Sequence, residues 1–391
     1  MIYRDFLGNK VSLLGMGAMR LPVHADGTVN EEQTREMVEY AMAHGINYFD
    51  TAWPYHGGHS EKVLGRILKD YPRESFYLAD KFPGHQIHTQ GYHPAQKFEA
   101  QLEACGVEYF DYYLLHNVYE NSIDVYMDPQ WDIVNYFREQ KRLGRIKHLG
   151  FSTHGSVEVM KKFLDYCEGD MEFCQIQMNY LDWTLQNAAE KYKLLTERGI
   201  PVVVMEPVRG GRLVNLSEKE MEGLRAARPE ASAADWAMRF FRSPMLGNLA
   251  TVLTGASSLQ QFMENTAAFE EGEVLTAEEM EVLFAAAEGM KDGVPCTACK
   301  YCVDGCPMGL DIPLFLSIYN ELKVQPAMTV AMRAEWQPDD KKPSACTACG
   351  KCSKICPQHI DIPARLAELT EMMKPIPKWA DACWQREQLQ G

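Results

Sequence analysis

Residues 49–55 read FDTAWPY. They belong to Asn47–Ala52, a short apolar run of the kind that forms a fully buried strand, and to the loop that follows it. Asp50 stands near the end of this run, and Tyr55 follows in the aromatic loop. A carboxylate and a tyrosine beside the end of a buried strand indicate a site formed where several strands end together.

Seven further apolar runs have the length and character of buried strands. They are Ser12–Gly17, Phe76–Lys81, Tyr109–His116, Ile146–Ser152, Phe173–Asn179, Pro201–Pro207 and Leu249–Ala256. Stretches with helical periodicity lie between them, such as Glu31–His44, Pro94–Ala104 and Ser156–Asp165. Eight strand-then-helix units in about 270 residues predict a (β/α)8 TIM barrel. The alternative is a doubly wound open sheet, but residues 15–20, GMGAMR, lack the third glycine of its usual dinucleotide motif.

Polar residues stand at the ends of these predicted strands. They are Asp50, Lys81, His116, Ser152, Gln177, Asn179 and Glu206, with Gly255 in the last strand. One such residue is usually a capped loop residue, whereas so many together indicate chemistry. Because the active sites of TIM barrels lie at the C-terminal ends of the strands, the pattern predicts an active site there.

The pattern resembles that of the aldo/keto reductase family. FDTAWPY, followed by Ser60-Glu61-x-x-Leu64-Gly65, is similar to the family signature. Further matches are Lys81, LLH at 114–116, GFS at 150–152 and QIQMN at 175–179. The resemblance covers nearly all of residues 1–290. It implies an NAD(P)-dependent oxidoreductase that reduces a small-molecule carbonyl substrate by hydride transfer.

The resemblance also implies a catalytic tetrad of Asp50, Tyr55, Lys81 and His116. Tyr55 would donate a proton to the carbonyl oxygen as the hydride arrives. A free tyrosine has a pKa of about 10, and we expect the charge of Lys81 to lower it. Asp50 would orient Lys81, and His116 would bind the carbonyl oxygen. The structural alternative is a buried ion pair beside an ordinary core histidine.

The family's cofactor-binding positions can be carried over to this sequence. They fall on Gly17, Met19, Ser152, Gln177, Met205, Pro207, Gly210, Gly211, Gly255, Ser257, Gln261, Glu264 and Asn265. Two positions depart from the family: Met205 stands where an aromatic residue is common, and Glu206 where a small hydroxyl residue is usual. A carboxylate would repel a pyrophosphate unless Arg209 or Arg212 compensates for it.

A basic residue that would hold a 2′-phosphate is missing from the expected place. Between Arg242 and Lys291 the sequence contains no Lys or Arg, although a dianionic phosphate is best held by such groups. We therefore expect NAD rather than NADP. FMN is a further candidate, because a flavin exchanges electrons singly or in pairs.

Two cysteine runs lie near the C-terminus and repeat each other. Residues 296–307 read CTACKYCVDGCP and residues 346–357 read CTACGKCSKICP. Three evenly spaced cysteines followed by Cys-Pro resemble the pattern of two-cluster bacterial ferredoxins, in which the fourth cysteine of each run binds the other cluster. One 4Fe–4S cluster is assigned to Cys296, Cys299, Cys302 and Cys356. The second is assigned to Cys346, Cys349, Cys352 and Cys306, and zinc is the alternative metal.

These patterns define the expected domains. Residues 1–290 form the barrel, 291–370 a partly helical, ferredoxin-like iron–sulfur domain with a helix near 314–323, and 371–391 a C-terminal tail. The other four cysteines are interpreted as ordinary thiols: Cys105, Cys167, Cys174 and Cys383.

Composition narrows the candidate partners and the compartment. The chain has 39 basic and 54 acidic residues, a net charge of −15, and no basic cluster, which argues against a nucleic-acid or membrane partner. No run has the roughly 18 apolar residues of a membrane span. Twelve cysteines without a signal-peptide pattern indicate metal chemistry in the cytoplasm.

The clusters raise a question of electron count, because each moves single electrons whereas a nicotinamide transfers two as hydride. Three interpretations stay open. The clusters are structural or redox-sensing beside an ordinary reductase; the barrel holds a flavin that exchanges electrons with them; or the barrel is a non-catalytic docking platform for a redox partner protein.

Overall fold

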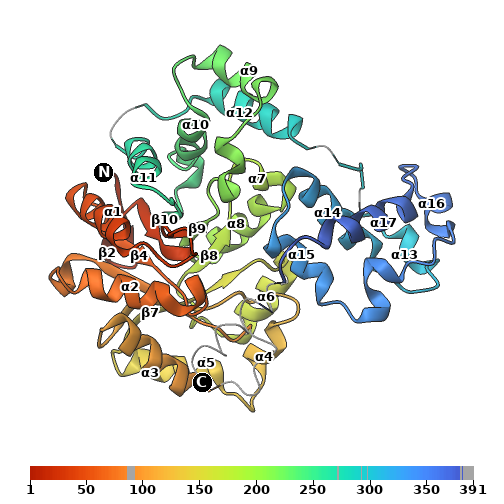
Figure 1. Cartoon of the computed structure of the whole chain (residues 1–391). Coiled ribbons are helices and arrows are strands. Elements are labelled where there is room, and N and C mark those ends of the chain that lie inside the picture. The colour runs from red at the N-terminus through yellow and green to blue at the C-terminus, as the bar shows by residue number, and fades with distance from the viewer. Residues whose placement is uncertain (86–92, 271–272, 292, 297, 379–380, 382–391) are drawn as a thin grey trace. The chain divides into compact units, whose positions relative to one another are not determined.

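The computed structural model describes residues 1–85, 93–270, 273–291, 293–296, 298–378 and 381 (Figure 1). The described chain divides into two compact units, residues 1–286 and 287–378. The first contains strands and helices in alternation, and in its described part the second is built from helices.

Eight parallel strands close into a barrel in the first unit, in the order β10-β3-β4-β5-β6-β7-β8-β9. The strands are β3 (Leu14–Gly17), β4 (Tyr48–Asp50), β5 (Tyr77–Phe82), β6 (Phe110–Leu115), β7 (Ile146–Thr153), β8 (Cys174–Gln177), β9 (Val202–Met205) and β10 (Leu249–Thr254). Each lies within or beside a run predicted from sequence. The prediction of a (β/α)8 barrel is confirmed, and the open-sheet alternative is wrong because β10 pairs with β3.

Helices follow the strands around the barrel. They are α1 (Glu31–Ala43), α2 (His59–Leu68), α3 (Pro94–Cys105), α4 (Ile123–Met127), α5 (Ile133–Arg142), α6 (Val157–Tyr166), α7 (Asp182–Leu185), α8 (Ala188–Glu197), α9 (Glu218–Ala227), α10 (Ala233–Phe240), α11 (Leu259–Ala267) and α12 (Ala277–Gly289). Several of these helices begin just after a residue whose side chain caps the first turn. Asn30 accepts from the Gln33 amide at the start of α1, and Ser156 and Ser258 cap α6 and α11 in the same way.

A hairpin that the sequence analysis did not predict precedes the barrel. Its strands β1 (Tyr3–Phe6) and β2 (Asn9–Ser12) are antiparallel. Phe6 is fully buried, stacks on Tyr112 with ring centroids 4.3 Å apart, and meets Phe173 edge-on. The hairpin therefore places an aromatic plug among residues near the starts of the strands, which leaves the opposite ends for the site.

The described part of the second unit contains the α-helices α13 (Tyr301–Asp304), α14 (Ile312–Val324), α15 (Met328–Glu335), α16 (Lys351–Ile355) and α17 (Ile362–Met373), with two short 3-10 helices, η6 (Asp339–Lys341) and η7 (Pro343–Ala345), before α16. The repeated Asp-Ile-Pro triplets begin two of them. Asp311 caps α14 by accepting from the Leu314 amide, and Asp361 caps α17 by accepting from the Ala364 amide. The sequence repeat thus becomes two similar loop-and-helix halves.

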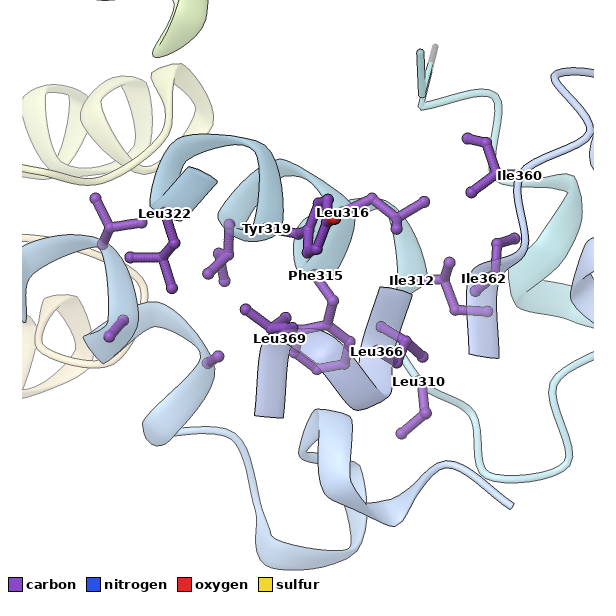
Figure 2. Close-up of a cluster of buried hydrophobic side chains, with 14 of the residues drawn as sticks. Leu310, Ile312, Phe315, Leu316, Tyr319, Leu322, Ile360, Ile362, Leu366 and Leu369 are labelled. Carbon is purple, nitrogen blue, oxygen red and sulfur yellow. The ribbon is translucent and has the colours of Figure 1, made fainter. Parts of the chain in front are cut away.

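The two halves share one apolar core (Figure 2). Phe315 from α14 lies beside Leu366 and Leu369 from α17, and all three are buried. Burying each such side chain contributes about 1.5–3 kcal/mol. In the part of the chain that the structure describes, no helix is long and apolar enough to cross a membrane.

Candidate functional site

Asp50 and Lys81 form a buried ion pair at neighbouring strand ends. Lys81 Nζ lies 2.5 Å from Asp50 Oδ1 and donates a second hydrogen bond, of 2.7 Å, to the Thr51 carbonyl. The lysine side chain is 1% exposed and the aspartate 2%. Asp50 Oδ2 has no hydrogen-bond partner among the described residues. The pair holds a positive charge at a fixed place beneath the loop that carries Tyr55.

Tyr55 and His116 flank this charge. Lys81 Nζ lies 5.0 Å from the centroid of the Tyr55 ring, and the Tyr55 and His116 rings are 6.1 Å apart, edge to face. His116 is buried, whereas Tyr55 is partly exposed. The structure thus brings all four residues of the expected tetrad together at the C-terminal ends of β4, β5 and β6.

The pKa of Tyr55 shifts in the opposite direction to the one expected from the sequence. Burial raises the pKa of Tyr55 well above its ordinary value, and the carboxylates of Asp50, Glu206 and Asp80 raise it further. The expected net lowering of the Tyr55 pKa is therefore wrong for this structure, because burial and the three carboxylates outweigh any effect of Lys81. Burial also raises the pKa of Asp50, against the effect of Lys81.

The His116 imidazole is uncharged at neutral pH and can form hydrogen bonds. Burial, His85 and Lys81 hold the pKa of His116 well below its ordinary value. His85, which the sequence analysis missed, is fully buried, and its Nδ1 lies 2.9 Å from the His116 carbonyl oxygen. Burial lowers the pKa of His85 to about 3. Both imidazoles are thus uncharged at neutral pH.

The loop after Tyr55 is a left-handed turn. His56, Gly57 and Gly58 all have positive φ, and His56 Nε2 accepts a 3.0 Å hydrogen bond from the Leu21 amide. Burial lowers the pKa of His56, which keeps that nitrogen available as an acceptor. His56 therefore ties the loop of Tyr55 to the loop after β3.

Arg20, rather than either expected arginine, compensates the charge of Glu206. Arg20 Nη2 lies 3.6 Å from Glu206 Oε1. The arginines that follow Glu206 are engaged elsewhere, Arg209 with Asp182 and Arg212 with Glu220. Arg20 lies in η1 (Ala18–Arg20), after β3, whereas Glu206 follows β9, and β10 lies between these two strands. The two residues are far apart in the sequence, so no local pattern predicts their pairing.

Asp182 organises the end of β8 and was also missed. Its carboxylate accepts from Gln177 Nε2 at 2.8 Å and Asn179 Nδ2 at 2.7 Å, and it pairs with Arg209. Gln177 Oε1 and two nitrogens of Arg209, Nε and Nη2, are buried without hydrogen-bond partners among the described residues. Ser152 Oγ accepts from the Asn117 amide at 2.8 Å. The Asp182 carboxylate thus holds the Gln177 amide and the Arg209 guanidinium in place, and each of these groups keeps atoms that can form further hydrogen bonds.

The remaining expected cofactor positions lie along two loops. Gly210 and Gly211 have φ of 59° and 94° within η4 (Arg209–Val214), next to Met205 and the buried Pro207. Arg20 lies beside Gly255, because a Cβ built on this glycine would sit 3.6 Å from Arg20 Cδ. Gly17 ends β3, and Met19 is exposed in η1.

At the start of α11, the Ser257 amide donates to Gln261 Oε1 at 2.9 Å. Asn265 Nδ2 donates to Thr254 Oγ1 at 2.8 Å, and Glu264 accepts from Gln260. These polar groups and helix N-terminus are suited to an adenosine moiety and its phosphates. Together with the free acceptor of Gln177 and the unused donors of Arg209, they fit a dinucleotide.

The cysteines line two cavities in the second unit, in the combination predicted. One cavity is lined by Cys296, Cys299, Cys302 and Cys356. The other is lined by Cys306, Cys346, Cys349 and Cys352. Among the described residues no group of three or more Cys, His, Asp or Glu side chains is placed to hold a single ion. Three cysteines from one run and a remote fourth, followed by proline, are the donor set of a 4Fe–4S cluster.

The backbone of both cysteine loops has the same twist. Ala298 and Lys300 have φ of 54° and 64°, and Ala348 and Gly350 have φ of 53° and 69°. Alternation of left- and right-handed residues turns successive amides toward one point and creates an anion-binding nest that is common at iron–sulfur sites. The donor set and the backbone thus both fit 4Fe–4S clusters.

Thiols outside these cavities behave as predicted in their burial. Cys105, Cys167 and Cys174 are buried, and burial raises the pKa of Cys167 to about 12. Cys383 and the two tryptophan positions of the tail lie outside the described residues. Within the first cavity, burial raises the pKa of Cys302 to about 11, so metal binding must displace a proton there.

A parallel barrel with polar residues at its strand ends, together with a unit that has two four-cysteine cavities, defines a (β/α)8 barrel protein with a cysteine-rich cluster-binding domain. The aldo/keto reductase family model matches residues 13–288, and the 4Fe-4S dicluster domain model matches residues 295–360. The chain belongs to the aldo/keto reductase family. The family resemblance and the iron–sulfur domain predicted from sequence are confirmed.

Relatives agree with this assignment. The chain is 28% identical over 211 residues to a probable aldo-keto reductase 1 from Glycine max, covering 52% of this chain and 58% of that protein. It is 28% identical to an NADH-specific methylglyoxal reductase of Escherichia coli (strain K12), covering 43% and 54%. An L-galactose dehydrogenase from Arabidopsis thaliana is 27% identical, covering 68% and 87%. The chain thus spans little more than half the length of the first two relatives.

Among solved structures, the aldo-keto reductase AKR11C1 from Bacillus halodurans in its holo form is similar. Its TM-score is 0.60 and its identity 28%, covering 73% of this chain and 96% of that one. The thermostable aldo-keto reductase Tm1743, at 22% identity and a TM-score of 0.59, shares the fold.

Proposed function

We propose that the chain reduces a small-molecule carbonyl compound, with Tyr55 as the proton donor and a nicotinamide dinucleotide as the reductant. A bound nicotinamide supplies hydride to the carbonyl carbon. The observation that carries the proposal is the convergence of Tyr55 and His116 on the buried Lys81–Asp50 pair. A non-catalytic platform would have no need for this buried charge.

The residues divide the work as follows. His116, neutral because of its burial, binds the carbonyl oxygen by a hydrogen bond and orients the substrate. Tyr55 keeps its proton at neutral pH because its pKa is raised, and it gives that proton to the oxygen as negative charge develops there. Lys81 then stabilises the tyrosinate that remains, and Asp50 holds the ammonium in place.

Replacement of Tyr55 with Phe tests this assignment. We expect carbonyl reduction to fall by about 10²–10⁴-fold, the usual contribution of general acid catalysis, while nicotinamide binding is retained. Tyr166→Phe is the matched control, because Tyr166 is 41% exposed on α6 and should tolerate the change. A Tyr55→Phe protein that turns over at the normal rate would exclude Tyr55 as the proton donor.

We further propose that the preferred dinucleotide is NAD. The support is the lack of basic residues between Arg242 and Lys291, together with the engagement of Arg20, the cation beside Gly255, by Glu206. Fluorescence titration with NADH and NADPH tests this preference. An NADPH preference that disappears in Arg20→Gln would identify Arg20 as a 2′-phosphate ligand and would overturn the choice of NAD. The exposed cluster cysteines support a reducing compartment, the cytoplasm.

A further inference from the structure

Two large apolar side chains project into solvent beside the cluster cavities. Tyr301 of α13 is 60% exposed and Ile355 of α16 is 55% exposed, the two highest values among the large apolar residues that the structure describes. The two helices pack against each other. Each side chain directly precedes a cysteine that lines a cavity, Cys302 and Cys356. Aromatic residues are enriched at the cores of protein interfaces, so an exposed tyrosine next to a cavity cysteine is a candidate contact for a partner.

Three lysines accompany these apolar groups. Lys300, Lys351 and Lys354 are exposed, and none forms an ion pair within the described residues. The two runs, residues 296–306 and 346–356, contain these three lysines and one acidic side chain, Asp304. We name Tyr301, Ile355 and the three lysines the α13–α16 face.

The clusters are accessible from this face. Cys299 and Cys349 are exposed, and Lys300 lines the same cavity as Cys299. An electron crosses between two centres efficiently only over a short distance, so a partner must approach a cavity that reaches the surface. The exposed cysteines, the unpaired lysines and the two apolar side chains all belong to the same two loops and helices.

We propose that the α13–α16 face docks a small acidic protein that carries one electron at a time. The lysines attract and orient an anionic partner that the rest of this acidic chain repels, and the two apolar side chains supply the contact that excludes water. In each encounter the partner's centre is oxidised by one electron, and a 4Fe–4S cluster passes from the 2+ to the 1+ state. The proposal rests on the cluster assignment and not on the carbonyl chemistry of the barrel.

Stopped-flow reduction of the full-length holoprotein by reduced flavodoxin, an acidic one-electron carrier, tests the proposal. The three lysines of the face are replaced with Gln. The control variant replaces Lys161, Lys193 and Lys219, three exposed lysines of the barrel, and changes the net charge equally. We expect the second-order rate constant at low salt to fall about tenfold or more in the face variant only, with a weaker dependence on salt. Tyr301→Ser should lower the rate at high salt as well.

Two measurements keep the result interpretable. Iron content and photoreduction by a small uncharged donor should be the same in all variants, which shows that the clusters are intact. NADH-dependent carbonyl reduction should be retained by the face variant, so failure of the barrel proposal is detected separately in the unmodified protein. Equal rates in the face and control variants would overturn the proposal. So would a dimer that dissociates only in the face variant while electron transfer is unchanged, because a second copy would then cover the face.

Discussion

Removal of the negative charge of Asp50 should destabilise the barrel strongly. In Asp50→Asn the ammonium of Lys81, 1% exposed in the folded protein, would keep the Thr51 carbonyl as a partner and lose its counter-ion. Breaking a buried ion pair at one side costs about 3–5 kcal/mol, because an uncompensated charge stays behind. This cost has an upper limit, because the buried ammonium of Lys81 can instead lose its proton and become neutral.

The limit follows from the ionisation of a free lysine. A free lysine has a pKa of about 10.4, so loss of its proton at pH 7 costs about 4.6 kcal/mol at 1.36 kcal/mol per pH unit. We therefore expect Asp50→Asn to lose about 3–5 kcal/mol of unfolding free energy at pH 7. If the proton is discarded, the folded variant binds one proton fewer than the unfolded chain. Its stability should then rise by about 1.4 kcal/mol per pH unit between pH 7 and 9.

Urea unfolding followed by tryptophan fluorescence measures these changes, with Lys81→Met and the double variant completing a cycle. Because the double variant buries no charge, it should be more stable than the sum of the single losses predicts, by about 2–3 kcal/mol. A loss below about 1 kcal/mol for Asp50→Asn, or strict additivity, would show that the pair is not a coupled buried ion pair.

Further predictions concern pH and the clusters. His85 and His116 have lowered pKa values in the folded protein, so the stability that they confer is present above the unfolded value of about 6.5 and is lost as the pH falls below it. The unfolding free energy should drop by about 1.4 kcal/mol per pH unit for each histidine as the pH falls from 6.5 to 5. In His85→Gln the contribution of one histidine to this pH dependence should disappear, which urea unfolding at several pH values measures. Cys306→Ser and Cys346→Ser should damage the same cluster, so the double variant should lose no more iron than either single variant. If Cys306→Ser instead acts with Cys302→Ser, the exchange of ligands between the runs is wrong.

Much of this fold is legible in the sequence because of how it buries its residues. Parallel barrel strands are covered on both faces, so they appear as continuous apolar runs, and the polar residue that ends each run marks the site. The cysteine assignment follows in the same way from spacing, and the cavities group Cys356 with the first run as the pattern predicts.

The features that sequence reasoning missed depend on contacts between distant segments. Arg20, after β3, pairs with Glu206, after β9, past the end of β10. Asp182, which follows β8, pairs with Arg209, which follows β9. No periodicity or spacing records such pairs. The error about the Tyr55 pKa has a related origin: sequence shows that a lysine is near but not that burial and three carboxylates outweigh any effect of that lysine.

The crossed arrangement of the cysteines has a consequence for biosynthesis. Each cavity takes three cysteines from one run and the fourth from the other, so Cys356 is needed before the first cavity has all its ligands. A chain still emerging from the ribosome can present three thiols of the first run but cannot close a complete site around iron. Both clusters must therefore be inserted after the second run has been synthesised. Cluster insertion can therefore be completed only in a chain whose two cysteine runs have both been synthesised.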